Sequence, residues 1–224
     1  MSSSNKLNPY KSRLTSEQAA AGMNAAIQNA HRLAGDARLL LDAGKIPSAL
    51  SLAILSLEEA GKVSILRGMI GECSEENLRD AWRRYRSHTA KNHLGLMLDF
   101  VKEGARHFYD FLPLFTDSSS EDRSMLDQLK QISFYTDCLG NAHWSKPMEV
   151  ISQDLASVFV VMAEIMSKKS VVTTTEAELW EQHMTPLAND RALINEQFEN
   201  WIRAMVDAGL MTEQHGRGLA KFTT

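Results

Sequence analysis

Residues 49–57 decide the fold, and they read Ala-Leu-Ser-Leu-Ala-Ile-Leu-Ser-Leu. Only Ser51 and Ser56 are polar in this stretch, and because both are small the stretch has no charged face. A helix that is apolar on every side usually lies at the centre of a bundle of helices. The sequence therefore predicts an all-α protein built around a central helix from about Pro47 to Met69.

Helical patterns also flank this central helix. Residues 15–18 have the spacing of a capping box, and apolar residues then recur at helical spacing as far as Leu41. Gly44 ends this first helix in a tight connection, which favours an antiparallel pair with the central helix. Further helices are predicted at about 74–106, 121–135, 149–169, 176–184 and 190–208. Loops are predicted at 109–120 and 140–147, a β-branched break at 171–175 and a frayed end after Gly209.

The pattern divides the chain into three parts. Residues 1–14 are polar and are expected to form a disordered N-terminal tail. Residues 15–170 are expected to form an up-and-down bundle of four to five long helices. Residues 171–224 are expected to form a short helical extension, called the C-terminal extension below.

The composition limits the classes of function. The 224 residues include 24 Lys and Arg against 28 Asp and Glu, a net charge of -4, which argues against a protein that coats nucleic acid without specificity. Any contact with RNA must therefore use a local basic patch. The two cysteines have neither CxxC nor zinc-site spacing, which favours a reduced, cytoplasmic protein. The apolar runs are too short to span a membrane, and the N-terminus lacks the apolar core of a signal peptide.

A local basic patch is present at residues 82–91, which read Trp-Arg-Arg-Tyr-Arg-Ser-His-Thr-Ala-Lys. An imidazole that titrates near neutrality can move a proton beside a phosphate held by guanidinium groups, so the patch suggests RNA as a ligand or substrate. One flank of the predicted helix carries Arg84, His88 and Lys91. Arg86 lies on the other flank of the apolar stripe, and Arg83 points away from it. The alternative is a solvated helix face with a histidine at its edge.

A pair of carboxylates follows the apolar run, in the order Glu58-Glu59-Ala60-Gly61-Lys62. Two carboxylates on a central helix are costly unless they are paired. Lys62 is within reach of Glu58 at four residues and of Glu59 at three. An ordinary ion pair within the helix and a role in orienting the basic patch are both open. Gly61, which is unfavourable inside a helix, predicts the close approach of another helix.

A third candidate feature runs from Lys130 through Tyr135 and Asp137 to the loop that contains Trp144. Tyr135 and Asp137 could contribute a hydroxyl and a carboxylate to a site. A loop held in place by aromatic packing is the favoured alternative. No metal motif, phosphate-binding loop or nucleophile motif is present and the other histidines are scattered, so the sequence predicts neither a metal nor a cofactor.

Taken in order, three blocks resemble the AbiV family of abortive-infection proteins, a branch of the HEPN superfamily. They are the apolar helix that ends in Glu-Glu-x-Gly-Lys at 49–62, the basic patch with its aromatic-Arg-Ser-His-x-x-Lys order at 82–91, and the segment from Leu129 to Pro147. The resemblance covers about residues 20–167. The third block departs from the family pattern at Ser133, Phe134, Thr136 and His143.

The resemblance implies a helical bundle that often forms homodimers. In the superfamily an Arg-x(4–6)-His motif forms a metal-independent endoribonuclease site, commonly across the dimer interface. Arg83 and His88 have the four-residue gap, and Arg86 with His93 is the alternative pair. Arg83 and His88 are about 140° apart on one ideal helix, so they converge only if the helix is distorted or if the arginine comes from the partner subunit.

The expected function is that of a phage-defence toxin that cleaves RNA and thereby shuts down translation. His88 is the expected acid-base residue, and Arg83 is expected to stabilise the transition state. The expected RNA-binding or supporting residues are Arg84, Arg86, Lys91, Glu59, Lys62, Tyr135 and Asp137. A phage-encoded protein is a candidate activator. The alternatives are a non-catalytic module that blocks translation by binding RNA or protein, and a structural dimer whose basic patch is only a solvated face.

Overall fold

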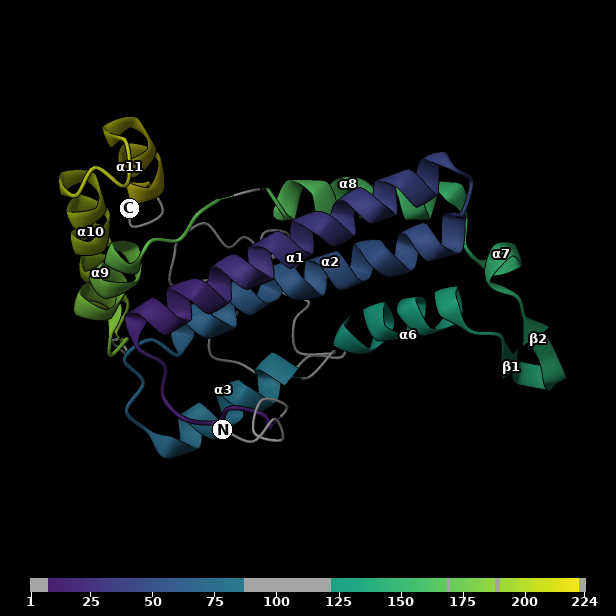
Figure 1. The fold of residues 1–224 in the computed structure, drawn as a ribbon, viewed down its shortest axis with the longest axis horizontal. Coiled ribbons are helices and arrows are strands. Elements are labelled where there is room, and N and C mark those ends of the chain that lie inside the picture. Colours follow the sequence, from purple (N-terminus) through teal and green to yellow (C-terminus); the bar gives the residue numbers. More distant parts are fainter. Residues whose placement is uncertain (1–7, 87–121, 169, 188–189, 222–224) are drawn as a thin grey trace, which may run out of the picture.

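The computed structural model describes residues 8–86, 122–168, 170–187 and 190–221 (Figure 1). Its longest elements are the antiparallel helices α1 (Ser16–Asp42) and α2 (Ile46–Gly68). Thr15 caps α1 through the expected capping box with Gln18, and Gly44 adopts the positive φ of 70° that suits the end of a helix. The predicted first pair of helices is therefore confirmed.

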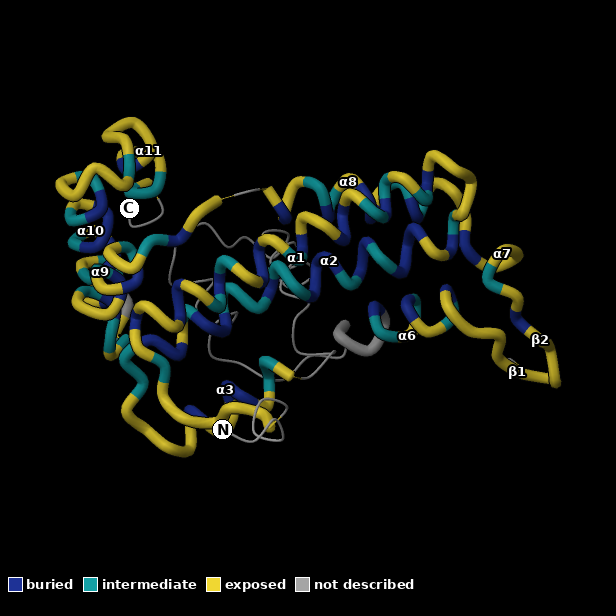
Figure 2. The backbone as a smooth tube through the Cα atoms, viewed as in Figure 1, coloured by how far each residue is buried: buried dark blue, intermediate teal, exposed yellow. Residues whose placement is uncertain are grey.

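The central place of α2 is confirmed as well. Leu50, Ala53 and Ile54 on α2 are completely buried, because other helices cover α2 on several sides (Figure 2). These neighbours are α1, α3 (Glu75–Arg86), α6 (Asp122–Phe134) and α8 (Gln153–Met166). The two serines of the apolar stretch are also buried, and their hydroxyls donate to backbone carbonyls, Ser51 to Pro47 and Ser56 to Ala30. Both hydroxyls are thus satisfied inside the core.

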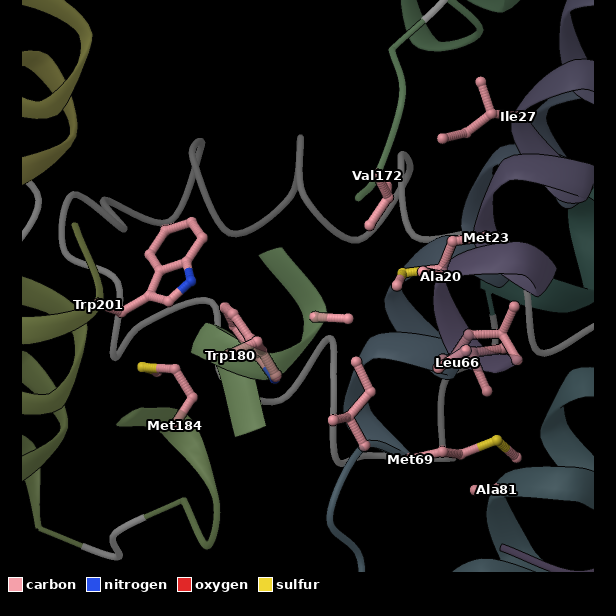
Figure 3. Packing of buried hydrophobic residues seen from close by; sticks show 14 of the residues in the cluster. Ala20, Met23, Ile27, Leu66, Met69, Ala81, Val172, Trp180, Met184 and Trp201 are labelled. Atoms are coloured by element: carbon pink, nitrogen blue, oxygen red, sulfur yellow. The ribbon is translucent and has the colours of Figure 1, made fainter. Parts of the chain in front are cut away.

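Two hydrophobic cores lie along the α1–α2 pair. The first, called the α6–α8 core, joins the C-terminal half of α1 and the N-terminal half of α2 to α6 and α8. The second, called the α3 core, joins the other halves of α1 and α2 to α3 and to the C-terminal extension. The extension consists of α9 (Thr174–Met184), α10 (Arg191–Asp207) and α11 (Glu213–Ala220). Figure 3 shows large side chains of the α3 core, among them Met23, Leu66, Met69, Trp180 and Trp201.

A short hairpin forms around the loop predicted at 140–147. It comprises β1 (Asp137–Leu139), a 3₁₀ turn at Gly140–Ala142 and β2 (His143–Ser145), and a one-turn helix, α7 (Pro147–Val150), follows it. The helix predicted at 149–169 is interrupted, because Ile151 is extended and the hydroxyl of Ser152 caps a new helix, α8. Each strand has only three residues, which is too short to show as a period-two pattern in the sequence.

Both ends of the described chain make contacts with the rest of the protein. Residues 8–14 belong to the expected disordered tail, but part of this segment contacts the turn before α3, where Arg13 donates a hydrogen bond to the carbonyl of Cys73. The end after Gly209 is not frayed, since Thr212 caps α11 and Gly216 of α11 packs against α10. The helix predicted at 74–106 is described as far as Arg86, and the loop predicted at 109–120 lies outside the described residues.

Candidate functional site

The two adjacent carboxylates of α2 have different partners. Glu59 accepts a hydrogen bond from the Lys62 ammonium at 2.5 Å, and the same ammonium lies 5.1 Å from the centre of the Tyr85 ring on α3. Both charged side chains are largely buried. Because a cation over an aromatic ring is an attractive contact, Lys62 links α2 to the last described turn of α3. Glu59 and Lys62 therefore lie beside the helix that carries the arginines.

Glu58 has a different partner, which sequence reasoning missed. Its carboxylate accepts a hydrogen bond from the Lys130 ammonium on α6 at 2.6 Å, and the two residues are 2% and 6% exposed. Lys130 also lies 3.0 Å from the more exposed carboxylate of Asp127. The signal that could have revealed Lys130 is its position four residues after Leu126, on the buried face of α6.

The surroundings of Lys130 keep its ammonium charged. Burial by itself lowers the pKa of a lysine, because it disfavours the charged form. Hydrogen bonds to Glu58 and Asp127 outweigh burial here, so the pKa of Lys130 lies above its usual value. The Glu58–Lys130 contact is therefore an ion pair at neutral pH, and it joins the first and third blocks of the sequence.

The described arginines of α3 have different surroundings. The side chain of Arg83 is 74% exposed and pairs at 2.8 Å with Asp80, one turn earlier in the helix. Exposed pairs of this kind are weak, so the guanidinium can exchange Asp80 for another anion. Arg86 is held more firmly, since it lies 4.8 Å from the centre of the Trp82 ring and donates to the carbonyl of Tyr10. Arg84 is half-buried.

A short N-terminal segment, residues 10–13, packs against α3 and is called the N-terminal strap below. The indole nitrogen of Trp82 donates to the carbonyl of Ser12 at 3.0 Å. The Tyr10 ring meets the Trp82 ring edge-on at 5.9 Å between centres, and the Tyr10 hydroxyl donates to the carbonyl of Arg13. Trp82 is 7% exposed and belongs to the α3 core. One side chain thus fixes α3 both to the bundle and to the strap.

His88 and Lys91 lie outside the described residues, as does His93 of the alternative Arg–His pair. The distance between Arg83 and the histidine therefore stays a prediction. The structure describes the helix that precedes His88, with Arg83 facing solvent and Lys62 against Tyr85.

Tyr135 and Asp137 are not brought to α3. They lie at the start of the hairpin, at the end of the bundle away from α3 (Figure 1). The prediction that aromatic packing holds this loop is wrong, because Tyr135 is 62% and Trp144 65% exposed. Ser145 holds the hairpin instead. Its buried hydroxyl accepts from the amide of Asp137 at 3.0 Å and donates to the carbonyl of the same residue at 3.2 Å.

Two kinds of feature are absent from the described part of the chain. Within it, no group of three or more His, Cys, Asp and Glu side chains is placed to hold a metal ion. No helix among the same residues combines the length and the hydropathy that crossing a lipid bilayer requires.

The three blocks of the sequence meet around α2, since Glu58 contacts α6 and Lys62 contacts α3. A family model described as AbiV, of the HEPN group, matches residues 18–168. This chain belongs to the AbiV family of HEPN proteins. The AbiV match runs from α1 to the end of α8, so the C-terminal extension lies outside it. No curated protein and no solved structure matches the chain.

Proposed function

We propose that this AbiV-family chain is a phage-defence toxin that cleaves RNA in the cytoplasm without a metal ion and thereby stops translation. The observation that carries the proposal is the exposed guanidinium of Arg83, which precedes His88 in the sequence with the Arg-x(4)-His spacing of the superfamily. A guanidinium that faces solvent can move onto the phosphate that is cleaved, whereas Arg86 is held by Trp82 and the strap and suits a fixed contact with RNA beside that phosphate.

The proposed reaction is a transesterification within RNA. The imidazole of His88 accepts the proton of a ribose 2′-hydroxyl, and the 2′ oxygen attacks the adjacent phosphorus. The bond from phosphorus to the 5′ oxygen breaks, and the resulting imidazolium returns the proton to that leaving oxygen. Arg83 stabilises the negative charge on the phosphate oxygens at the transition state. The products are a 2′,3′-cyclic phosphate and a free 5′-hydroxyl.

A homodimer fits this chemistry, since the partner subunit can supply the arginine that a single straight helix directs away from its own histidine. Arg84, Arg86 and Lys91 are proposed to bind RNA beside the cleavage site. Glu59 and Lys62 are proposed to support the site by holding α3 through Tyr85. Tyr135 and Asp137 lie at the end of the bundle away from α3, so they are proposed to bind RNA at a distance from Arg83.

Induced expression in a bacterial host tests the proposal. Wild type, Arg83→Ala and His88→Ala are compared at equal soluble levels for growth arrest and for new fragments in total RNA. Arg79→Ala is the matched control, because Arg79 is also exposed and lies one turn before Arg83 on the same helix. We expect arrest with RNA fragments for wild type and the control, and neither for the two site variants. Arrest that persists in both site variants with intact RNA would contradict catalysis.

The fragments themselves provide a second test. Cleavage through the 2′-hydroxyl leaves ends that carry a 2′,3′-cyclic phosphate, persists in EDTA and spares DNA. Expression without phage and infection with phage are compared in the same strains, because a phage-encoded protein is the proposed activator. RNA binding without cleavage in the infected cells would favour the non-catalytic alternative.

A further inference from the structure

The C-terminal extension shares its core with α3, although it lies outside the family match. Trp180 of α9 and Trp201 of α10 meet edge-on at 5.3 Å between ring centres. They belong to the same cluster of buried residues as Leu66 of α2 and Trp82 of α3. In Figure 3 the two extension tryptophans lie on the side of the cluster opposite Leu66 and Ala81. The end of the α1–α2 pair is therefore covered by the extension on one side and by α3 on another.

The extension also contacts the turn that leads from α2 into α3. Gly71 in this turn has φ +70°, and a Cβ atom there would lie 2.6 Å from the Thr185 methyl group, Cγ2, just after α9. The Thr185 hydroxyl donates to the carbonyl of Ile70 at 3.0 Å. The turn thus needs a glycine for two reasons, since the backbone conformation disfavours a side chain and Thr185 occupies the space that a side chain would take.

Polar contacts from α1 and α2 hold the extension against this turn. Arg67 of α2 pairs with Glu176 of α9 at 2.6 Å, with both side chains less than a fifth exposed, and its guanidinium lies 5.1 Å from the centre of the Trp180 ring. The amide side chain of Asn24 donates to the carbonyl of Val172 and accepts from the amide of the same residue. Partly buried contacts of this kind are stronger than exposed ion pairs, so they define one docked position for the extension.

We infer that Thr185 is a positioning residue, through which the C-terminal extension sets the direction of α3 and hence the place of Arg83. The described part of α3 has three buried residues, Leu78, Ala81 and Trp82, so contacts at the two ends of the helix add substantially to those that its own packing supplies. The Gly71 turn holds the start of α3, and the N-terminal strap holds its other end through Trp82. The part of this inference that concerns activity rests on the proposed function.

A pair of glycine variants distinguishes the effect of the contact with Thr185 from the effect of the unfavourable backbone conformation. Gly71→Ala and Gly44→Ala both place a side chain at φ +70°. Only at Gly71 does the new methyl group meet Thr185, because no described atom lies within 4 Å of the corresponding position at Gly44. We expect hydrogen exchange of the α3 amides to become about tenfold faster in Gly71→Ala than in Gly44→Ala, with equal exchange in α6 and α8. Equal exchange of α3 in the two variants would overturn the inference.

A rescue variant tests Thr185 directly. Thr185→Ser removes the methyl group that the new Cβ would meet and keeps the hydroxyl that donates to Ile70. Combined with Gly71→Ala, it should return part of the lost protection of α3, because the Thr185 Cβ atom and the Glu181 Cγ atom still lie 3.1 Å and 3.2 Å from the new Cβ. Thr185→Val keeps the shape and removes the donor, so alone it should also speed exchange in α3. Because Thr185→Val leaves Gly71 in place, it tests the positioning role of Thr185 even if Gly71→Ala does not fold. Unchanged α3 exchange in Thr185→Val, or no rescue by Thr185→Ser, would contradict a positioning role.

The link to activity is measured in the same strains as the proposed function. If wild type arrests growth, Gly71→Ala should weaken the arrest more than Gly44→Ala does at equal soluble levels, and adding Thr185→Ser to Gly71→Ala should restore part of it. Equal arrest in both glycine variants would show that the extension does not act on the site. If wild type causes no arrest in the presence or absence of phage, the proposed function fails, whereas the exchange experiment still decides whether Thr185 positions α3.

Discussion

Glu58 and Lys130 form an ion pair with 2.6 Å between the carboxylate and the ammonium, although they are 72 residues apart in the sequence. Both are almost completely buried, and the pair joins the central helix α2 to α6. The neighbouring Glu59 pairs with Lys62, whose ammonium reaches Tyr85 on α3. Glu58 directly, and Glu59 through Lys62, thus link the first of the three AbiV blocks to the other two.

Removing either partner of the Glu58–Lys130 pair should lower the free energy of unfolding, and the two single substitutions should not lower it by the same amount. Lys130→Met leaves Glu58 buried without this lysine and should lower the free energy of unfolding by about 3–5 kcal/mol. Glu58→Leu should cost less, because Asp127 still lies 3.0 Å from Lys130. The double variant should be more stable than the sum of the single losses predicts, as measured by urea unfolding. Strictly additive losses would show that the two residues do not interact.

The same pair should weaken at alkaline pH. Because the pKa of Lys130 is raised in the folded protein, its contribution to the free energy of unfolding is complete below the unfolded value of about 10.4 and is lost as pH rises through the folded value. The difference in stability between wild type and Lys130→Met should therefore narrow above that pH. Lys146→Met is the control, since Lys146 forms an exposed pair with Glu149. If the difference in stability between wild type and Lys130→Met stayed constant at alkaline pH, the assigned ion pair would be contradicted.

An acid-sensitive contact joins α1 to α8. Two hydrogen bonds from the Arg38 guanidinium, each 2.8 Å, hold the pKa of Glu164 below its usual value. Its contribution to stability is therefore present above the unfolded pKa and is lost as pH falls through the lower folded value. Glu164→Gln should be less stable than wild type at neutral pH, and the difference should shrink as the pH falls below about 4.3. Glu178→Gln is the control, because Glu178 is exposed. If the stability difference between wild type and Glu164→Gln grew as the pH fell, the assigned effect of Arg38 on Glu164 would be contradicted.

The N-terminal strap should loosen when the Trp82 donor is removed. Trp82→Phe keeps an aromatic ring in the α3 core and deletes the hydrogen bond to Ser12, so it should cost about 1 kcal/mol. Trypsin should then cleave faster after Lys11 and Arg13 in native conditions. Trp201→Phe, a matched change in the C-terminal extension, should leave the rate of strap cleavage unchanged. Equal cleavage of wild type and Trp82→Phe would show that Trp82 does not hold the strap.

At the hairpin, Ser145 should contribute more to the free energy of unfolding than the larger side chains of Tyr135 and Trp144. Tyr135→Ser and Trp144→Ser should each change the free energy of unfolding by less than about 0.5 kcal/mol, because both side chains are exposed. Ser145→Ala removes a buried hydroxyl that serves both backbone groups of Asp137, and it should cost about 1–3 kcal/mol. Thermal unfolding of the three variants checks this order. A larger loss for Trp144→Ser would restore the idea of aromatic packing.

The candidate site follows from the sequence only in part. The block that contains Glu59 and Lys62 is beside α3, as a supporting role requires, because the helical repeat places both residues on one flank of α2. Tyr135 and Asp137 belong to another block of the same family pattern, yet they lie at the far end of the bundle. A short connection such as the one at Gly44 predicts which end of a bundle the next helix begins at, but no such connection placed the end of α6, which depends on how the helices pack.

The sequence by itself determined the features that depend on neighbours within about four residues. These are the capping box of Thr15, the stop at Gly44, the apolar stretch at residues 49–57 of α2 and the reach of Glu59 to Lys62. Tertiary structure alone decided the partner of Glu58, the docking of the N-terminal strap on Trp82 and the contact of Thr185 with the Gly71 turn. Each of these joins residues at least 70 positions apart, so it exists only after the helices have packed and buried polar groups have taken the partners within reach.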